Sequence, residues 1–198
     1  MQITADLVKQ LRDRTGAGMM ECKKALAGTG GDLDKAVDEL RKSGAAKAEK
    51  RADRAALEGR VESYIHPGNR VGVLIEVNCE TDFVARTDEF RELVRNLAMQ
   101  AAAAGAEYVR REDVPADRIA KEREIYAAQL AGQGKPAAVI DKILEGKLDR
   151  FYSETCLLEQ PYIRDDKKTI AAIVQEAGAK TGENIIVRRF ARFRLGQD

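Results

Sequence analysis

Few side chains in this sequence could carry out chemistry. The only histidine, His66, lies in an expected turn at residues 66–70, and no second zinc-type ligand is close to it in sequence. The three cysteines, Cys22, Cys79 and Cys156, are far apart and form no C-x-x-C pair. No G-x-x-x-x-G-K-[ST] phosphate loop and no G-x-G-x-x-G fingerprint is present. We therefore expect a protein that is not an enzyme and that has no catalytic residue, metal site or cofactor.

The stretch that could form a binding site is Thr81-Asp82-Phe83-Val84. It joins an expected strand to an expected helix, and such a corner presents its side chains at the end of a sheet on a rigid scaffold. An acidic and a large aromatic residue side by side are unusual there. The spacing alone favours a structural role, in which Asp82 caps the helix and Phe83 packs in the core. The alternative is a contact surface for a partner.

The elements around this corner predict an α+β fold. Residues 71–79 alternate between apolar and other side chains, which is typical of a strand with one buried face. A Pro-Gly turn at 66–70 and a strand at 60–65 complete a hairpin, and a third strand is expected at 183–195. Helices are expected from residue 88, over 115–130, from 136 to about 157 and over 170–177, with a short strand at 108–111. This order predicts a three-stranded antiparallel sheet covered by helices.

The first 44 residues predict a three-helix module that resembles ubiquitin-associated-type binding modules. Thr4 and Asp32 are suitable caps for its first and third helices, and Gly44 would follow its last turn. Met19 shares a helical face with Cys22, so we expect it in the core. Met20 lies off that face and is either half-buried without a role or contact surface. Residues 45–59 are expected to form a charged, partly helical linker, and 60–198 the α+β core.

Charge and hydropathy argue against several classes of function. Of 198 residues, 34 are basic and 33 acidic, and the net charge of +1 disfavours a general nucleic-acid binder. The last strand does carry Arg188, Arg192 and Arg194 on one face, and we interpret that face as a solvated outer surface rather than an RNA site. No apolar run is long enough to span a membrane, and no signal peptide is recognisable, so a cytoplasmic protein with reduced thiols is expected.

Three segments of the sequence resemble bacterial translation elongation factor Ts in its short form. They are residues 11–26 (LRDRTGAGMMECKKAL), residues 76–86 (EVNCETDFVAR) and residues 42–44 (KSG), and residues 181–190 (TGENIIVRRF) look like the end of the short form. The resemblance implies a guanine-nucleotide exchange factor that binds the GDP form of elongation factor Tu and speeds GDP release.

The resemblance also implies roles for residues. The corner Thr81 to Val84 would approach the nucleotide site of the GTPase, with Phe83 as a wedge and Asp82 disturbing the groups that hold magnesium. The first module, including Arg12, Met19 and Met20, would dock on the same GTPase domain. Short members of the elongation factor Ts family pair as homodimers, so the resemblance implies a homodimer in which residues 60–198 also form the dimerisation domain. No segment is long and regular enough for the coiled coil of the longer members.

Two alternatives follow from the residues themselves. One is a binding adaptor whose three-helix module grips another partner. The other is an RNA-binding protein that uses the basic face of the last strand.

Overall fold

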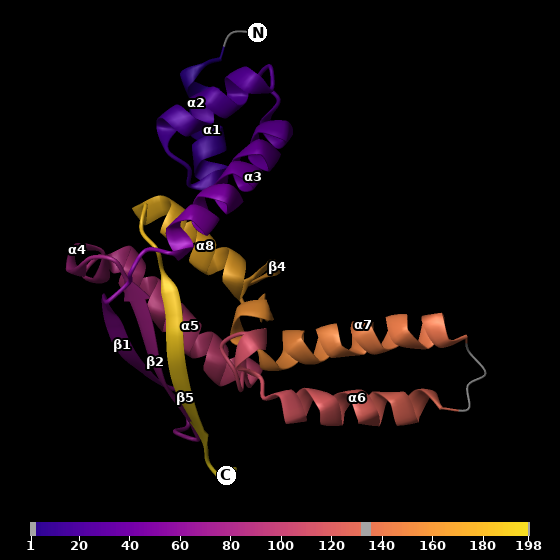
Figure 1. The fold of residues 1–198 in the computed structure, drawn as a ribbon. Helices are drawn as coiled ribbons and strands as arrows, with labels where there is room; N and C mark the ends of the chain where they lie inside the picture. Colours follow the sequence, from indigo (N-terminus) through magenta and orange to yellow (C-terminus); the bar gives the residue numbers. More distant parts are fainter. Residues whose placement is uncertain (1–2, 132–135, 198) are drawn as a thin grey trace. The chain divides into compact units, whose positions relative to one another are not determined.

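The computed structural model describes residues 3–131 and 136–197, and the chain divides into two compact units. The first unit comprises Met1–Arg60, Val77–Leu93 and Ala172–Ile186, and the second comprises Val61–Glu76, Val94–Ala171 and Val187–Asp198. The fold is α+β, as predicted (Figure 1). Within the described residues, none of the helices has both the length and the apolar character that crossing a membrane requires.

Three helices begin the chain: α1 (Ala5–Thr15), α2 (Met19–Gly28) and α3 (Leu33–Ala52). The Thr4 hydroxyl accepts the Leu7 N–H at 3.3 Å, and Asp32 accepts two N–H groups of the first turn of α3, so both predicted caps are confirmed. The helices enclose a small apolar core of Val8, Leu11, Cys22, Ala25, Leu26 and Ala36.

The third helix is longer than predicted. It does not stop at Gly44 but continues to Ala52, with Gly44 in helical conformation. Residues 45–52 are mostly Ala, Lys, Glu and Arg, which are strong helix formers. An ion pair between Lys47 and Glu21 of α2 supports the added turns. A single glycine, which costs a helix about 1 kcal/mol relative to alanine, does not overcome these contributions.

The sheet consists of β1 (Glu58–Ile65), β2 (Val71–Cys79) and β5 (Ile186–Arg194), in the order β1-β2-β5 (Figure 1). It is antiparallel, as predicted. The alternation in β2 buries Val73, Ile75, Val77 and Cys79. Helix α5 (Asp88–Ala104) begins where the helical spacing predicted and buries Phe90, Leu93, Val94, Leu97, Ala98 and Ala101. The main sheet and the helix that follows it could therefore be read from periodicity.

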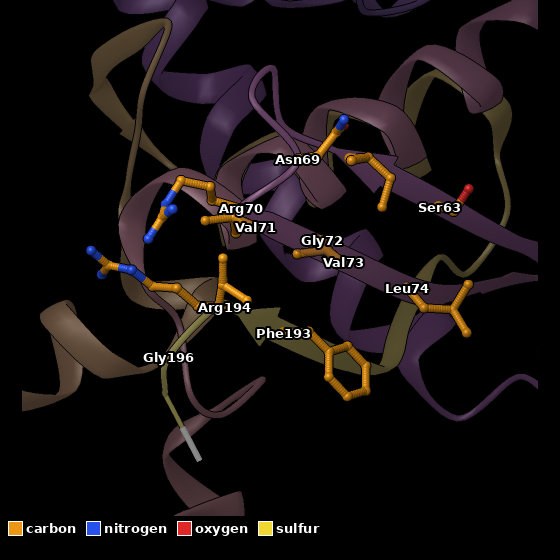
Figure 2. A pocket seen from close by; sticks show the side chains of 12 residues that line it. Ser63, Asn69, Arg70, Val71, Gly72, Val73, Leu74, Phe193, Arg194 and Gly196 are labelled. Atoms are coloured by element: carbon orange, nitrogen blue, oxygen red, sulfur yellow. The ribbon is translucent and has the colours of Figure 1, made fainter.

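Alternation in the last strand predicts one apolar face, formed by Ile185, Val187, Ala191, Phe193 and Leu195, and this prediction is only half correct. Ile185 and Val187 are buried, but Phe193 and Leu195 are 72% and 64% exposed. Together with Leu74, Phe193 lines a surface hollow on the face opposite the buried side chains of β2 (Figure 2). Arg188 and Arg189 are consecutive and both exposed, so the alternation shifts there, and the residues after them do not keep the faces that periodicity predicted.

Two further helices, α6 (Ala116–Leu130) and α7 (Ala137–Thr155), lie side by side as an antiparallel pair (Figure 1). The sequence analysis expected these helices but no coiled coil. Lys147 of α7 donates to Gln129 of α6 at 2.9 Å and lies over the Tyr126 ring, which links the two helices. The predicted break at residues 132–134 lies outside the described residues.

The segments around this helical pair differ from the prediction. No strand forms at 108–111: Tyr108 makes an isolated bridge to Cys156, and a 3-10 helix η1 (Arg111–Asp113) follows. After α7 come a 3-10 helix η2 (Leu157–Glu159), a hairpin of β3 (Pro161–Tyr162) and β4 (Asp165–Thr169), and α8 (Ile170–Thr181). The hairpin was missed because its strands lack the alternation of apolar residues that marks a half-buried strand.

Candidate partner-binding site

The corner after β2 is a short helix with its own cap. Strand β2 ends at Cys79, and α4 spans Asp82–Ala85. Thr81, in extended conformation, accepts the Val84 N–H with its hydroxyl at 3.4 Å and is the N-cap. The expectation that Asp82 caps the helix is therefore wrong. A threonine hydroxyl in this position leaves the Asp82 carboxylate free for another use.

Phe83 points into solvent. It is 79% exposed, whereas Ala85 two positions later is buried. The structural role that spacing favoured, with Phe83 in the core, is wrong. Burying a phenylalanine side chain is worth roughly 1.5–3 kcal/mol, and the folded monomer forgoes most of it at this position. A large apolar side chain held in water at the tip of a corner is a candidate contact for a partner.

Asp82 is half-buried and pairs with a more exposed cation, Arg86. Its carboxylate lies 2.7 Å from a guanidinium nitrogen of Arg86, one helical turn further on. Exposed pairs of this kind contribute about 0–1 kcal/mol, so a competing cation or partner can displace Arg86 at little cost. Val84 is half-buried, and its carbonyl accepts the Thr87 hydroxyl at 2.8 Å. Thr87 in turn accepts the Phe90 N–H, which begins α5 directly behind the corner.

A residue that the sequence analysis missed holds the corner in place. One carboxylate oxygen of Glu183, Oε2, accepts the N–H groups of Glu80 and Thr81 at 3.0 and 3.1 Å. The other, Oε1, accepts the Thr81 hydroxyl at 2.5 Å. The signal in the sequence is topological. An antiparallel β5 beside β2 brings the start of β5 close to the end of β2, so an acidic residue just before β5 could have been considered.

Cys79 is a structural neighbour of the corner. Its thiol donates to the Thr81 carbonyl at 3.2 Å, and the residue is fully buried. Burial, with a smaller contribution from the negative charge of Glu183, raises the pKa of Cys79 to about 11. The group is therefore a neutral thiol near pH 7 and lacks the thiolate that nucleophilic chemistry needs.

The second predicted contact surface lies on the three-helix module. Arg12 on α1 is exposed, and Met19 and Met20 at the start of α2 are 58% and 76% exposed. The expectation that Met19 belongs to the core is wrong. Met19 is the first residue of α2, so only part of its side chain can reach the core on which Cys22 packs.

A shallow hollow of about 550 Å³ lies beside Met20, lined by Met20, Glu21, Lys23, Lys24, Ala27 and Lys47. The side-chain hydrogen bond from Lys47 is the main cause that lowers the pKa of Glu21. Three lysines against one paired glutamate make this surface basic, and the adaptable Met20 side chain lies at its edge.

The basic residues of β5 do not form one solvated stripe. Arg188 and Arg194 are exposed, but Arg192 is half-buried, and within the described residues its buried Nε has no hydrogen-bond partner. Phosphate recognition by a row of arginines needs their guanidinium groups in solvent. The expected outer surface is thus found for only two of the three side chains.

Comparison with known proteins gives one family. The model of the family described as Elongation factor TS matches residues 3–197. The elongation factor Ts of Coprothermobacter proteolyticus is 59% identical over 197 residues, which covers 100% of both chains. That of Anaeromyxobacter sp. (strain Fw109-5) is 58% identical over 196 residues, covering 99% of this chain and 90% of the relative. The chain belongs to the elongation factor Ts family, the nucleotide exchange factors of elongation factor Tu.

Proposed function

We propose that the chain binds the GDP form of elongation factor Tu and promotes GDP release by disturbing the magnesium and phosphate site with the corner Thr81–Val84. The observation that carries this proposal is the 79% exposure of Phe83 on a capped helix at the end of the sheet. A GTPase holds its nucleotide largely through Mg²⁺ and backbone amides around the phosphates. An apolar wedge and a carboxylate are suited to disturbing these two features.

The thermodynamic basis is differential affinity. An exchange factor must bind the nucleotide-poor conformation of the GTPase better than the nucleotide-loaded one, and that difference lowers nucleotide affinity by the same factor. Phe83 would stabilise a displaced packing arrangement in the partner. Asp82, which pairs with the exposed Arg86, would compete for the groups around magnesium. No bond is made or broken, so this chain needs neither a cofactor nor catalytic residues.

The three-helix module would supply docking. Exposed methionines fit irregular apolar surfaces, because their unbranched side chains have several accessible rotamers. Met19 and Met20 at the start of α2, and Arg12 on α1, would contact the GTPase domain outside its nucleotide site. The division of the chain into a module at 1–44, a linker at 45–59 and a core at 60–198 remains our proposal for how these contacts are distributed.

The outer face of the sheet would pair with a second copy of the chain. Its exposed apolar side chains are Val61, Ile65, Leu74, Phe193 and Leu195. A hollow of about 560 Å³ lies among the last four of them (Figure 2). A homodimer with two-fold symmetry places the same apolar patch on both sides of one interface. Sedimentation of the wild type as a dimer and of Phe193→Glu as a monomer would support this arrangement, and a monomeric wild type would contradict it.

The proposed partner places the chain in the cytoplasm, where its three buried thiols would stay reduced. The contacts would be made with protein alone, without direct nucleic-acid binding.

The experiment that tests the proposed function is the release of a fluorescent GDP from elongation factor Tu, followed by stopped flow. Wild type should accelerate release in a concentration-dependent way, and Phe83→Ala and Asp82→Ala should slow the stimulated release. Ile125→Ala on α6 and Asp141→Ala on α7 are matched controls, because both side chains are exposed on the helical pair. Wild-type rates with both corner variants, at unchanged circular dichroism, would rule out the proposed site.

A further inference from the structure

The corner that carries Phe83 is fixed by a carboxylate from a segment 100 residues later in the chain. We propose that Glu183 is a positioning residue of the exchange site, which holds the backbone of Glu80 and Thr81 so that Phe83 is presented in one orientation. The proposal rests on the function proposed for the corner. It assigns no contact with elongation factor Tu to Glu183 itself.

The geometry shows why a carboxylate is needed at this place. The N–H groups of Glu80 and Thr81 follow the end of β2 and precede the first turn of α4. Because neither the sheet nor the helix supplies an acceptor there, they need one from elsewhere in the chain. Glu183 accepts both, at 3.0 and 3.1 Å, and also accepts the Thr81 hydroxyl. The three hydrogen bonds to this carboxylate are charge-assisted, and such bonds are stronger than hydrogen bonds between neutral groups.

The next residue completes a reciprocal arrangement. The Asn184 N–H donates to Oε1 of Glu80 at 2.6 Å, while Glu183 accepts the N–H of Glu80. The two dipeptides 80–81 and 183–184 therefore hold each other through side chain and backbone in both directions. Neither segment can move without breaking several of these hydrogen bonds.

The same arrangement reaches the end of α3. The buried amide of Asn184 donates to the carbonyls of Ala52 and Arg54 at 3.2 and 2.9 Å. Arg54 lies 3.5 Å from the carboxylate of Glu80. The network thus joins the corner to the residues that follow the three-helix module, and all of its members belong to the first compact unit.

Rigidity at this position has a functional consequence. A wedge contributes to exchange only if it stabilises the displaced state of the partner more than the loaded state. In a mobile corner, Phe83 could turn aside in the complex with the nucleotide-loaded GTPase. The entropy lost when such a corner becomes ordered would also weaken binding to the displaced conformation. Loss of Glu183 should therefore lower the rate of GDP release at saturation while the docking contacts on α1 and α2 remain.

The test compares Glu183→Ala and Glu183→Gln with wild type and with Phe83→Ala in titrations of stimulated GDP release. Glu183→Gln keeps the shape of the side chain and one carbonyl acceptor but loses the charge. We expect the saturating rate to fall roughly tenfold or more with Glu183→Ala, by analogy with the loss seen when positioned groups are displaced, and less with Glu183→Gln. The half-saturating concentration should change less than twofold. Glu124→Gln, an exposed glutamate on α6, is the charge-matched control and should leave both quantities unchanged.

Two further measurements separate positioning from general stability. Amide hydrogen exchange at Glu80 and Thr81 should accelerate in both Glu183 variants, while amides of the α1–α3 core keep wild-type protection. A double-mutant cycle combines Thr81→Val with Glu183→Ala. Both variants remove the hydrogen bond between the Thr81 hydroxyl and Glu183, so the product of the two single fold-losses in saturating rate should exceed the loss in the double variant. Glu183→Gln serves alone if Glu183→Ala does not fold.

A wild-type saturating rate in both Glu183 variants, with Phe83→Ala slow, would overturn the positioning role and leave the corner's function intact. If Phe83→Ala instead keeps the wild-type saturating rate of GDP release, the function proposed for the corner is wrong. The proposal for Glu183 then fails as well. A shift in the half-saturating concentration alone would assign Glu183 to docking and would also contradict the proposal.

Discussion

The corner at Thr81–Val84 and the exposed surface of the three-helix module both present large apolar side chains to solvent, but they hold them differently. Phe83 lies on a short helix whose cap and preceding backbone are fixed by Glu183. Met19 and Met20 lie at the first residues of α2, where Gly18 provides no side-chain cap. One region has a rigid ring on a fixed backbone, and the other has adaptable side chains on a small helical core.

This difference indicates a division of labour. To weaken nucleotide binding, a side chain must hold its position against the GTPase. Only a fixed wedge binds the displaced conformation of the GTPase better than the nucleotide-loaded conformation. Docking requires affinity for both states, and methionines provide contact area without demanding one geometry. The corner should thus control the rate at saturation, and the module should control the concentration at which saturation is reached.

The largest expected effect is that of Phe83→Ala. Truncating a buried aromatic anchor at an interface costs roughly 2 kcal/mol or more, so the saturating rate of GDP release should fall about 30-fold. Because Phe83 is exposed in the free chain, the midpoint of thermal unfolding should stay at the wild-type value. Stopped-flow titration and calorimetry measure the two quantities. A lowered unfolding midpoint would show that Phe83 also supports the fold and would weaken the comparison.

Asp82→Asn should have a smaller effect that depends on magnesium. If the carboxylate acts on the groups around the metal, the variant should slow stimulated release by roughly tenfold in millimolar Mg²⁺, a loss typical of one charged hydrogen-bonding group. The difference from wild type should shrink as Mg²⁺ is removed with EDTA. An equal loss with and without the metal would assign Asp82 to ordinary binding.

Met20→Ala tests the docking role of the three-helix module, which the comparison with the corner assigns to it. We expect the half-saturating concentration to rise about fivefold, which corresponds to the loss of a contact worth about 1 kcal/mol. The saturating rate should stay at the wild-type value. Met19→Ala and Arg12→Ala should act in the same direction. The same titration provides the readout, and a lower saturating rate with Met20→Ala would contradict the division of labour.

The smallest effect concerns pH and the fold behind the corner. An unfolded cysteine loses its proton at about pH 8.5, whereas the pKa of Cys79 is raised to about 11 in the fold. Between these values the folded chain binds more protons than the unfolded one. The contribution of Cys79 to the free energy of unfolding is therefore complete below pH 8.5 and is lost as the pH rises towards 11.

Urea unfolding at several pH values between 8 and 11 measures this dependence. Stability should fall less steeply for Cys79→Ala than for wild type. Parallel curves for the two proteins would show that this thiol does not contribute to the pH dependence.

Particular residues show what the sequence could and could not predict. Alternation in β2 predicted its buried face, because each strand residue lies on one side or the other. The same rule failed in β5, because the alternation shifts at the consecutive exposed residues Arg188 and Arg189, and Phe193 therefore does not share the covered face with Val187. Met19 was misplaced because its spacing matches the core stripe although it begins its helix.

The candidate site was proposed from a resemblance and not from spacing, which favoured a buried Phe83. Glu183 could not be found from local pattern at all. Its role depends on two backbone N–H groups more than 100 residues away that lack partners in any regular element. Hydrogen bonds of this kind become visible only when the chain is folded.

The most direct test of the account is the affinity of the chain for elongation factor Tu with GDP bound and with the nucleotide removed, measured by calorimetry for wild type and Phe83→Ala. Wild type should bind the nucleotide-free GTPase much more tightly, and the ratio should equal the factor by which it weakens GDP binding. Phe83→Ala should reduce that ratio while keeping wild-type affinity for the GDP form. An unchanged ratio, with both affinities lowered equally, would show that Phe83 only docks and would contradict the wedge.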